Sequence, residues 1–177
     1  MKRVLGVIAA TAFIIGAAAP VQAMGSSDAY ENMQVGVTYT VYEPSFTAGL
    51  KARHLGGNDL CQKGTEQNLT VQYGKGNGRN FTITEGNPMC WDIANGATVL
   101  RTSVNGSKAF VQAYCDPASS KKCTKADVIK YGGHLEVTLP GANGLRPTRI
   151  WIETYGGNNL SAQQLVRIAR SLAPVGS

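Results

Sequence analysis

The side chains of this chain best suited to acid–base or metal chemistry are two histidines, His54 in "KARHLGGN" and His134 in "GGHLEV". A serine nucleophile activated by either would be expected in a G-x-S-x-G turn, and that motif does not occur. A histidine at the start of a strand is more often exposed or hydrogen-bonded than catalytic. Glycoside hydrolysis would instead need two carboxyl groups roughly 5 to 9 Å apart. The acids are sparse and scattered, Glu85, Asp92, Glu136 and Glu153 among them, and nothing singles out a pair.

Four cysteines, Cys61, Cys90, Cys115 and Cys123, form the second group with distinctive chemistry. An even number in an exported chain indicates two disulfides, for which three pairings are possible. We favour Cys115–Cys123, because "CDPASSKKC" is a compact turn-rich loop, and this leaves Cys61–Cys90. Because the chain has no C-x-x-C spacing and only two histidines, we expect neither a metal site nor a cofactor.

Aromatic and basic residues near the C-terminus form a candidate binding face. Alternation along "TRIWIETY" places Trp151, Tyr155 and Arg149 opposite the apolar stripe of that strand. Arg146 lies just upstream, and Tyr42 comes from an earlier strand. Stacked aromatic rings with arginines could hold a sugar, a lipid headgroup or a protein partner, if the face is exposed. The alternative is that this face is buried as well.

The first 23 residues have the features of a secretory signal peptide. Lys2 and Arg3 precede an uncharged apolar run, and Val21-Gln22-Ala23 supplies small residues at the cleavage positions. We therefore expect a secreted or extracytoplasmic protein, located in the cell envelope or periplasm, with no transmembrane anchor after cleavage. Removing Lys2 and Arg3 lowers the net charge by two, from +6 to +4. This mild excess is well short of a nucleic-acid-binding footprint, so we expect no nucleic-acid partner.

Most of the remaining chain alternates with the period of β-strands. Residues 24–34 are polar and are expected to form a flexible N-terminal segment, followed by a single domain over 35–177. A glycine- and asparagine-rich turn joins two short runs into a hairpin, and Asn105-Gly106 suits a type I′ turn in a second hairpin. The predicted strands lie at 35–44, 50–55, 69–74, 81–86, on both sides of Asn105-Gly106, at 133–139 and at 148–155, and "TKADVIKYGG" predicts a short helix.

The C-terminal stretch "LSAQQLVRIARSLAP" predicts one amphipathic helix. Ser161 and Gln164 have the spacing of a capping box. Leu165, Ile168 and Leu172 follow helical periodicity and form one apolar stripe. Because hairpin connections imply antiparallel pairing and one-layer sheets need a cover, we expect an α+β fold. In this fold a single antiparallel sheet of about six to seven strands is covered by the terminal helix, with one short additional helix and two disulfides.

Both ends of the chain resemble a bacterial extracytoplasmic domain family of unknown function. The resemblance rests on "YTVYEPSFTAGLK" near the start and "TRIWIETYGGNNLSAQQLVRIARSL" at the end. That family occurs as the C-terminal domain of lipoprotein-like and anti-sigma-like envelope proteins. The middle, with "AYCDPASSKKC" and "GGHLEVTLP", is similar to small secreted actinobacterial proteins of unassigned activity. These motifs are structural, so the resemblance implies a fold and no functional residues.

The main hypothesis is a non-enzymatic binding domain of the cell envelope whose ligand is a protein, a cell-wall polymer or a lipid. One alternative is a small envelope hydrolase that uses His134 or a carboxylate pair. Another is a disulfide-stapled protease inhibitor that presents the loop over 115–123. A deep polar pocket at His134 would favour the hydrolase, and a protruding rigid loop would favour the inhibitor. An apolar cleft between sheet and helix would favour a lipid or peptide ligand.

Overall fold

A computed structural model describes the molecule over residues 26–58, 67–75, 78–87, 89, 96–115, 122–157 and 160–176. Its elements, in chain order, are α1 (Ser26–Gly36), β1 (Tyr42–Pro44), β2 (Ala52–Asn58), β3 (Asn68–Gly74), β4 (Asn80–Gly86), β5 (Ala97–Val104), β6 (Ser107–Ala113), α2 (Asp127–Tyr131), β7 (Gly132–Leu139), β8 (Thr148–Tyr155), α3 (Ala162–Arg170) and β9 (Leu172–Pro174). None of the helices in these ranges is both long and apolar enough to cross a membrane.

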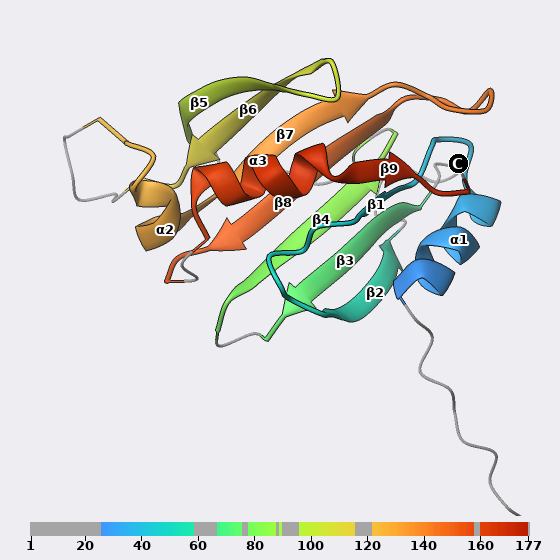
Figure 1. The fold of residues 1–177 in the computed structure, drawn as a ribbon, viewed down its shortest axis with the longest axis horizontal. Coiled ribbons are helices and arrows are strands. Elements are labelled where there is room, and N and C mark those ends of the chain that lie inside the picture. The colour runs from blue at the N-terminus through green and yellow to red at the C-terminus, as the bar shows by residue number, and fades with distance from the viewer. Residues whose placement is uncertain are drawn as a thin grey trace, which may run out of the picture.

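Seven strands form one antiparallel sheet, in the order β2-β3-β4-β8-β7-β6-β5 (Figure 1). β1 and β9 form a separate two-stranded antiparallel sheet. Figure 1 shows α3 lying across one face of the large sheet, with β5 at one edge and β2 at the other. The predicted antiparallel sheet is therefore confirmed.

Both hairpins predicted from turn residues are present. β3 pairs with β4 from Leu69↔Glu85 to Gly74↔Asn80. β5 pairs with β6 around Asn105 and Gly106, whose φ angles are 47° and 84°. A type I′ turn needs positive φ at both central residues, which is why Asn-Gly suits this position.

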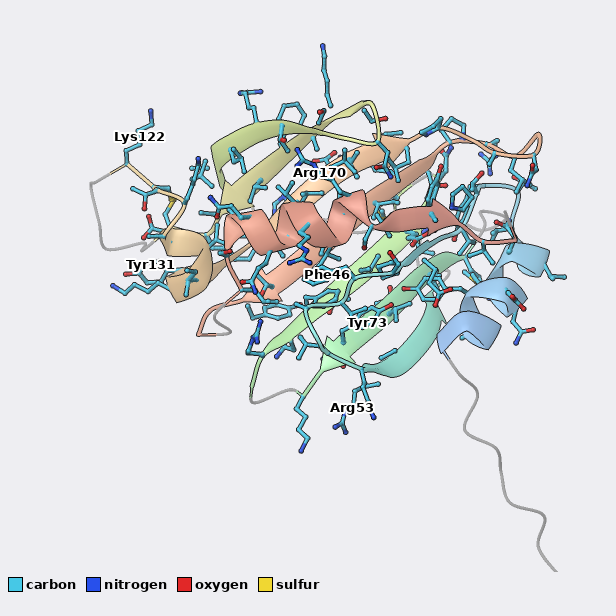
Figure 2. The ribbon with its side chains drawn as sticks, viewed as in Figure 1. Phe46, Arg53, Tyr73, Lys122, Tyr131 and Arg170 are labelled. Atoms are coloured by element: carbon cyan, nitrogen blue, oxygen red, sulfur yellow. A yellow bond between two sulfur atoms is a disulfide. The ribbon has the colours of Figure 1, made fainter. Side chains whose placement is uncertain are left out.

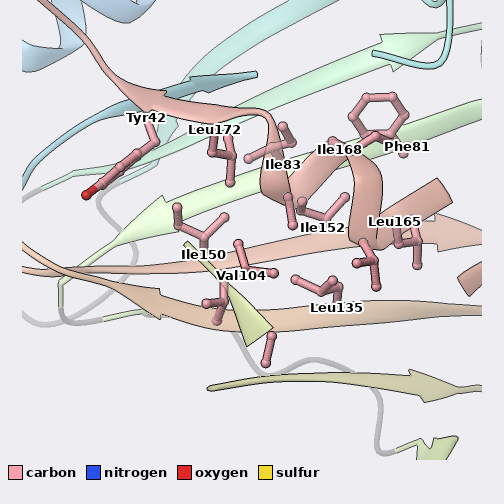
Figure 3. Packing of buried hydrophobic residues seen from close by; sticks show 14 of the residues in the cluster. Tyr42, Phe81, Ile83, Val104, Leu135, Ile150, Ile152, Leu165, Ile168 and Leu172 are labelled. Atoms are coloured by element: carbon pink, nitrogen blue, oxygen red, sulfur yellow. The ribbon is translucent and has the colours of Figure 1, made fainter. Parts of the chain in front are cut away.

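Alternate residues of β7 and β8 build the core under α3. Ile150, Ile152 and Leu135 are fully buried on the face of the sheet that the helix crosses. Leu165 and Ile168 of α3 are also fully buried, and Figure 3 shows them between the helix and these strands. This inner face carries the apolar stripe of each strand.

The capping box at the start of α3 is formed as predicted. Ser161 accepts a hydrogen bond from the Gln164 backbone N–H, and its own N–H donates to the Gln164 side chain. The helix ends at Arg170, earlier than the apolar spacing indicates. Leu172, expected on the helical stripe, lies in β9 opposite Pro44 and is still buried.

The N-terminal part of the domain differs from the sequence prediction. A helix, α1, spans Ser26–Gly36, where a flexible segment was expected over 24–34. Only Tyr42–Pro44 of the predicted strand at 35–44 is a strand. Tyr30 anchors the helix, because its hydroxyl is buried 2.8 Å from the Tyr73 hydroxyl of β3. A single aromatic contact of this kind produces no hydrophobic periodicity in a polar segment, so the sequence pattern does not predict the helix.

Cys115 and Cys123 form a disulfide with a Cα–Cα distance of 5.6 Å, which confirms the favoured pairing. Cys61 and Cys90 lie outside the described residues, as do residues 1–23, for which a signal peptide is expected. The predicted short helix is present as α2, directly after this disulfide. The N-cap of α2 is Ala126, and no side chain caps the helix; the Thr124 hydroxyl and backbone N–H donate to the Asp127 carboxylate.

Candidate functional site

Two of the five predicted binding residues lie together on the outer face of β8, the face opposite α3. The Arg149 guanidinium lies 5.0 Å from the centroid of the Trp151 ring and 2.5 Å from a carboxylate oxygen of Glu136. Trp151 is only 7% exposed, so its ring is not available for stacking on a ligand. Its indole Nε1 is buried without a hydrogen-bond partner. The Trp151 ring is therefore buried, whereas the Arg149 side chain beside it is 45% exposed.

Tyr155 lies at the end of β8 and is the exposed aromatic of this face, with 51% of its surface accessible. Its hydroxyl donates to one Glu153 carboxylate oxygen at 3.1 Å. The Tyr114 hydroxyl donates to the other oxygen at 2.5 Å. Burial and the adjacent Glu153 carboxylate raise the pKa of both tyrosines. The two phenols therefore remain neutral donors that hold Glu153 in place.

Tyr42 and Arg146 are not part of this group. Tyr42 is 4% exposed, and its hydroxyl donates to the Pro140 carbonyl at 2.5 Å. Arg146 donates through Nε to the Thr38 hydroxyl at 2.9 Å, which ties the loop before β8 to the N-terminal segment. Tyr42 begins β1, and Arg146 contacts the segment that leads into this strand. The five predicted residues therefore do not form one surface.

His134 lies on the outer face of β7, opposite Gln112 of β6 and Glu153 of β8. It is 3% exposed, and its Nδ1 is buried without a hydrogen-bond partner. Burial lowers the pKa of His134, and the carboxylates of Glu153 and Glu136 oppose this shift. The imidazole is thus a buried neutral group of the sheet. The side chain of His54 lies outside the described part of the molecule.

Glu85 of β4 is the one buried carboxyl group among the described residues. Its Oε2 accepts the Tyr42 backbone N–H at 2.9 Å, and its Oε1 has no hydrogen-bond partner. Burial raises the pKa of Glu85 well above its ordinary value, and the hydrogen bond from Tyr42 only partly offsets this. No group of three or more histidine, cysteine, aspartate or glutamate side chains in the described ranges could hold a metal ion.

A groove of about 430 Å³ lies between α3 and the edge strand β5. Leu100 and Val166 give it an apolar floor, and polar and basic side chains line the rest of it. Its lining residues are Leu100, Thr102, Gln163, Val166, Arg167 and Arg170.

Two helical stripes on α3 explain why the groove forms at this place. Leu165 and Ile168 belong to the buried stripe that fixes the helix on the sheet. The other stripe, Gln163, Val166, Arg167 and Arg170, has the i, i+3, i+4, i+7 spacing of one helical face. It is displaced from the buried stripe and faces the rim of the sheet, where Leu100 and Thr102 point toward the helix.

Arg170 closes one end of the groove. Its Nε donates to the Ser103 carbonyl at 3.3 Å, and its Nη2 donates to the Thr102 hydroxyl at 3.1 Å. Figure 2 places Arg170 on the side of α3 that faces β5 and β6, and Phe46 on the opposite side. A guanidinium has five N–H donors, so Arg170 keeps donors for a further acceptor.

Arg167 also lines the groove, but its guanidinium is directed away from it. The guanidinium lies 3.9 Å from the centroid of the Phe46 ring, on the side of α3 opposite Arg170. Within the part of the chain that the structure describes, neither Arg167 nor Arg170 lies within ion-pair distance of a carboxylate. The groove therefore combines an apolar floor with the positive charge of Arg170, which no described acid neutralises.

The binding residues predicted from the sequence include none of Leu100, Val166, Arg167 and Arg170. The spacing of Gln163, Val166 and the two arginines was the available signal. It was ambiguous, because helical spacing does not tell which strand edge a second stripe will face.

Comparisons with known proteins do not add a relative. No protein-family model matches the chain, and neither a search of curated proteins nor one of solved structures finds a match. The geometry of the groove, the inner face and the outer face is therefore the basis for inferring function.

Proposed function

We propose that this protein is a non-enzymatic binding domain that holds an acidic, amphiphilic ligand in the groove between α3 and β5. The observation that carries the proposal is the groove itself, with an apolar floor at Leu100 and Val166 beside Arg170. An apolar group of the ligand would lie on the floor, and its anionic group would bind Arg170. Arginine suits this role because its fork of donors matches a carboxylate.

The rigidity of the two walls supports a binding role. α3 is held by the fully buried Leu165 and Ile168, and its first turn is fixed by the capping box. β5 is held by its ladder to β6, and the Asn105 side chain of their turn donates to the Leu172 carbonyl at 3.0 Å. Walls that are already ordered reduce the entropy lost when a ligand binds.

We also propose two further features of the fold. The helix α3 covers the apolar face of the sheet, and Cys61 and Cys90 form a second disulfide. The burial of Leu165 and Ile168 supports the position of α3 over the sheet. Because Cys115 pairs with Cys123, the remaining possible disulfide is Cys61–Cys90.

We place the protein outside the cytoplasm, in the cell envelope or secreted. The apolar leader over 1–23 and the Cys115–Cys123 disulfide support this location, because disulfides persist in oxidising compartments. The resemblance to bacterial extracytoplasmic domains, drawn from the motifs at both ends, agrees with it. A ligand met in that compartment would be a protein segment, a cell-wall polymer or a lipid.

The test uses 1-anilinonaphthalene-8-sulfonate, a dye that is both apolar and anionic, with the folded protein over residues 24–177. Dye fluorescence should rise and saturate with the wild type. Val166→Glu places a carboxylate on the groove floor, and Arg170→Gln removes a positive charge, so both should weaken dye binding. Circular dichroism would confirm that each variant is folded.

Arg79→Gln is the matched control, because it removes one exposed arginine from the turn between β3 and β4. Its dye affinity should equal that of the wild type. Equal affinity for the wild type, Val166→Glu and Arg170→Gln would show that the dye binds elsewhere and would remove the groove as the ligand site.

A further inference from the structure

The backbone of β5 offers hydrogen-bonding groups along one edge of the large sheet. β5 pairs only with β6 among the described strands, so its other side is an edge. In a two-residue hairpin the residues that flank the turn exchange both hydrogen bonds, and this pattern repeats at every second residue. With the register Val104↔Ser107 and Thr102↔Ala109, the N–H and C=O groups of Arg101 and Ser103 point away from β6.

A hydrogen bond made by Arg170 agrees with this orientation. Its Nε donates to the Ser103 carbonyl, which must therefore point toward the edge. The carbonyl of Ser103 is occupied in this way, whereas the Ser103 N–H and both backbone groups of Arg101 have no partner among the described residues. β5 thus presents three edge groups directly beside the groove.

The opposite edge of the sheet differs. α1 contacts β2, and the β2 ladder has an irregularity between Ala52 and His54. Both features disfavour the addition of a strand, because edges are commonly protected by covering elements and by bulges. The irregularity in β5 lies between Thr98 and Leu100, outside the Arg101–Ser103 stretch.

We infer that the occupant of the groove is an extended peptide segment with an acidic residue, which joins β5 as an additional antiparallel strand. This inference rests on the proposed binding function and names the ligand class. Backbone groups of the peptide pair with Arg101 and Ser103, and alternate side chains enter the groove over Leu100 and Val166. The acidic side chain binds Arg170. Strand addition of this kind supplies affinity through the main chain and selectivity through the alternate side chains.

The register defines a probe. The peptide Glu-Thr-Val-Thr-Val-Thr, labelled with fluorescein at its C-terminus, runs antiparallel to β5 with its first residue near the end of β5 that holds Arg170. Residues directly opposite each other point to the same face of a sheet. The threonines therefore lie opposite Ser103 and Arg101, and the valines lie over the groove. Fluorescence anisotropy with the protein over residues 24–177 should give saturable binding.

Backbone methylation separates strand addition from simple docking of side chains. The threonine N–H groups point to β5, and those of the valines point away. Methylation of the threonine amides should weaken binding by about tenfold or more, which is the size of effect expected for lost hydrogen bonds. Methylation of the valine amides should leave it nearly unchanged. Equal losses from both peptides, or no loss from the threonine methyl groups, would overturn the inference.

A double-mutant comparison tests the acidic contact. Replacing the glutamate of the probe by glutamine should weaken binding severalfold to the wild type, and should have little effect on Arg170→Gln. Equal effects of the glutamine probe on both proteins would show that Arg170 does not bind the acid.

The dye experiment distinguishes the two possible failures. If the dye binds the groove and the peptide neither binds nor displaces it, the peptide inference is wrong and the binding function stands. If neither probe binds, both proposals are wrong. If only Glu-Thr-Val-Thr-Val-Thr binds and its affinity is unchanged by Val166→Glu, the peptide occupies another site and the inference is also overturned.

Discussion

Alternate residues of β8 point to the two faces of the large sheet, and the two faces can be compared position by position. The inner face carries Ile150 and Ile152 beneath α3, and on β4 it carries the buried Glu85. The outer face carries Trp151 and, on β7, the buried His134. Both faces therefore bury one titratable group with an unpaired polar atom.

The two groups differ in the charge that each would carry if it were ionised: Glu85 would be negative and His134 would be positive. Burial raises the pKa of Glu85 and lowers the pKa of His134, and in both cases the charged form is the one disfavoured. Alternation alone would assign the outer face to solvent. Trp151 and His134 are only 7% and 3% exposed, so residues on a strand face with a polar sequence pattern can still be buried.

The largest effect should come from the packing of the inner face. Leu165→Ala removes a fully buried side chain of α3, and a loss of about 2 to 5 kcal/mol in the free energy of unfolding is expected. Gln163→Ala, on the exposed side of the same helix, should change it by about 0.5 kcal/mol or less. Urea unfolding followed by circular dichroism measures both, and similar losses would mean that α3 does not pack on the sheet.

A smaller effect with a defined pH dependence should come from Glu85. As pH rises above about 4.3, the unfolded chain releases this proton while the folded protein keeps it. The contribution of Glu85 to the stability of the wild type should therefore fall as pH rises from 4 to 7. Glu85→Gln should remove this loss and gain stability relative to the wild type over that interval. Urea unfolding at pH 4, 5.5 and 7 tests this, and a constant difference between the two proteins would contradict a raised pKa.

His134 should give the opposite slope. As pH falls below about 6.5, the unfolded chain takes up a proton on this histidine that the folded protein resists. Wild-type stability should therefore fall between pH 7 and pH 5, and His134→Gln should make the dependence flatter there. Glu153 lies opposite His134 and Glu136 lies two residues away on the same face, and both oppose the effect. A steeper dependence in His134→Gln would show that these carboxylates dominate.

The smallest effect should come from the exposed ion pair of the outer face. Arg149→Gln removes the contact with Glu136 and the stacking over Trp151. Because the side chains are 45% and 27% exposed, the expected loss is about 1 kcal/mol or less. The part of this stability loss that comes from the ion pair should be smaller in high salt. Unfolding in low and high salt measures it, and a loss of several kcal/mol would mean that Trp151 depends on Arg149 for its burial.

Local patterns predicted much of the secondary structure. The Asn105-Gly106 turn, the Ser161–Gln164 capping box and the β3–β4 hairpin each depend on residues a few positions apart. The Cys115–Cys123 bond closes a loop with a sequence separation of 8 and belongs to the same group. Such features depend on propensities that nearby residues alone supply.

The sequence by itself therefore determined the antiparallel hairpins, the start of the terminal helix and the short disulfide. Only the tertiary structure decided that β4 pairs with β8, that the Tyr42 N–H donates to Glu85, and that Leu100 and Val166 line one groove. The physical reason is that alternation defines two faces for every strand but does not name what covers them. That choice depends on contacts between residues far apart in the chain, and both the burial of Trp151 and His134 and the groove beside β5 arise from it.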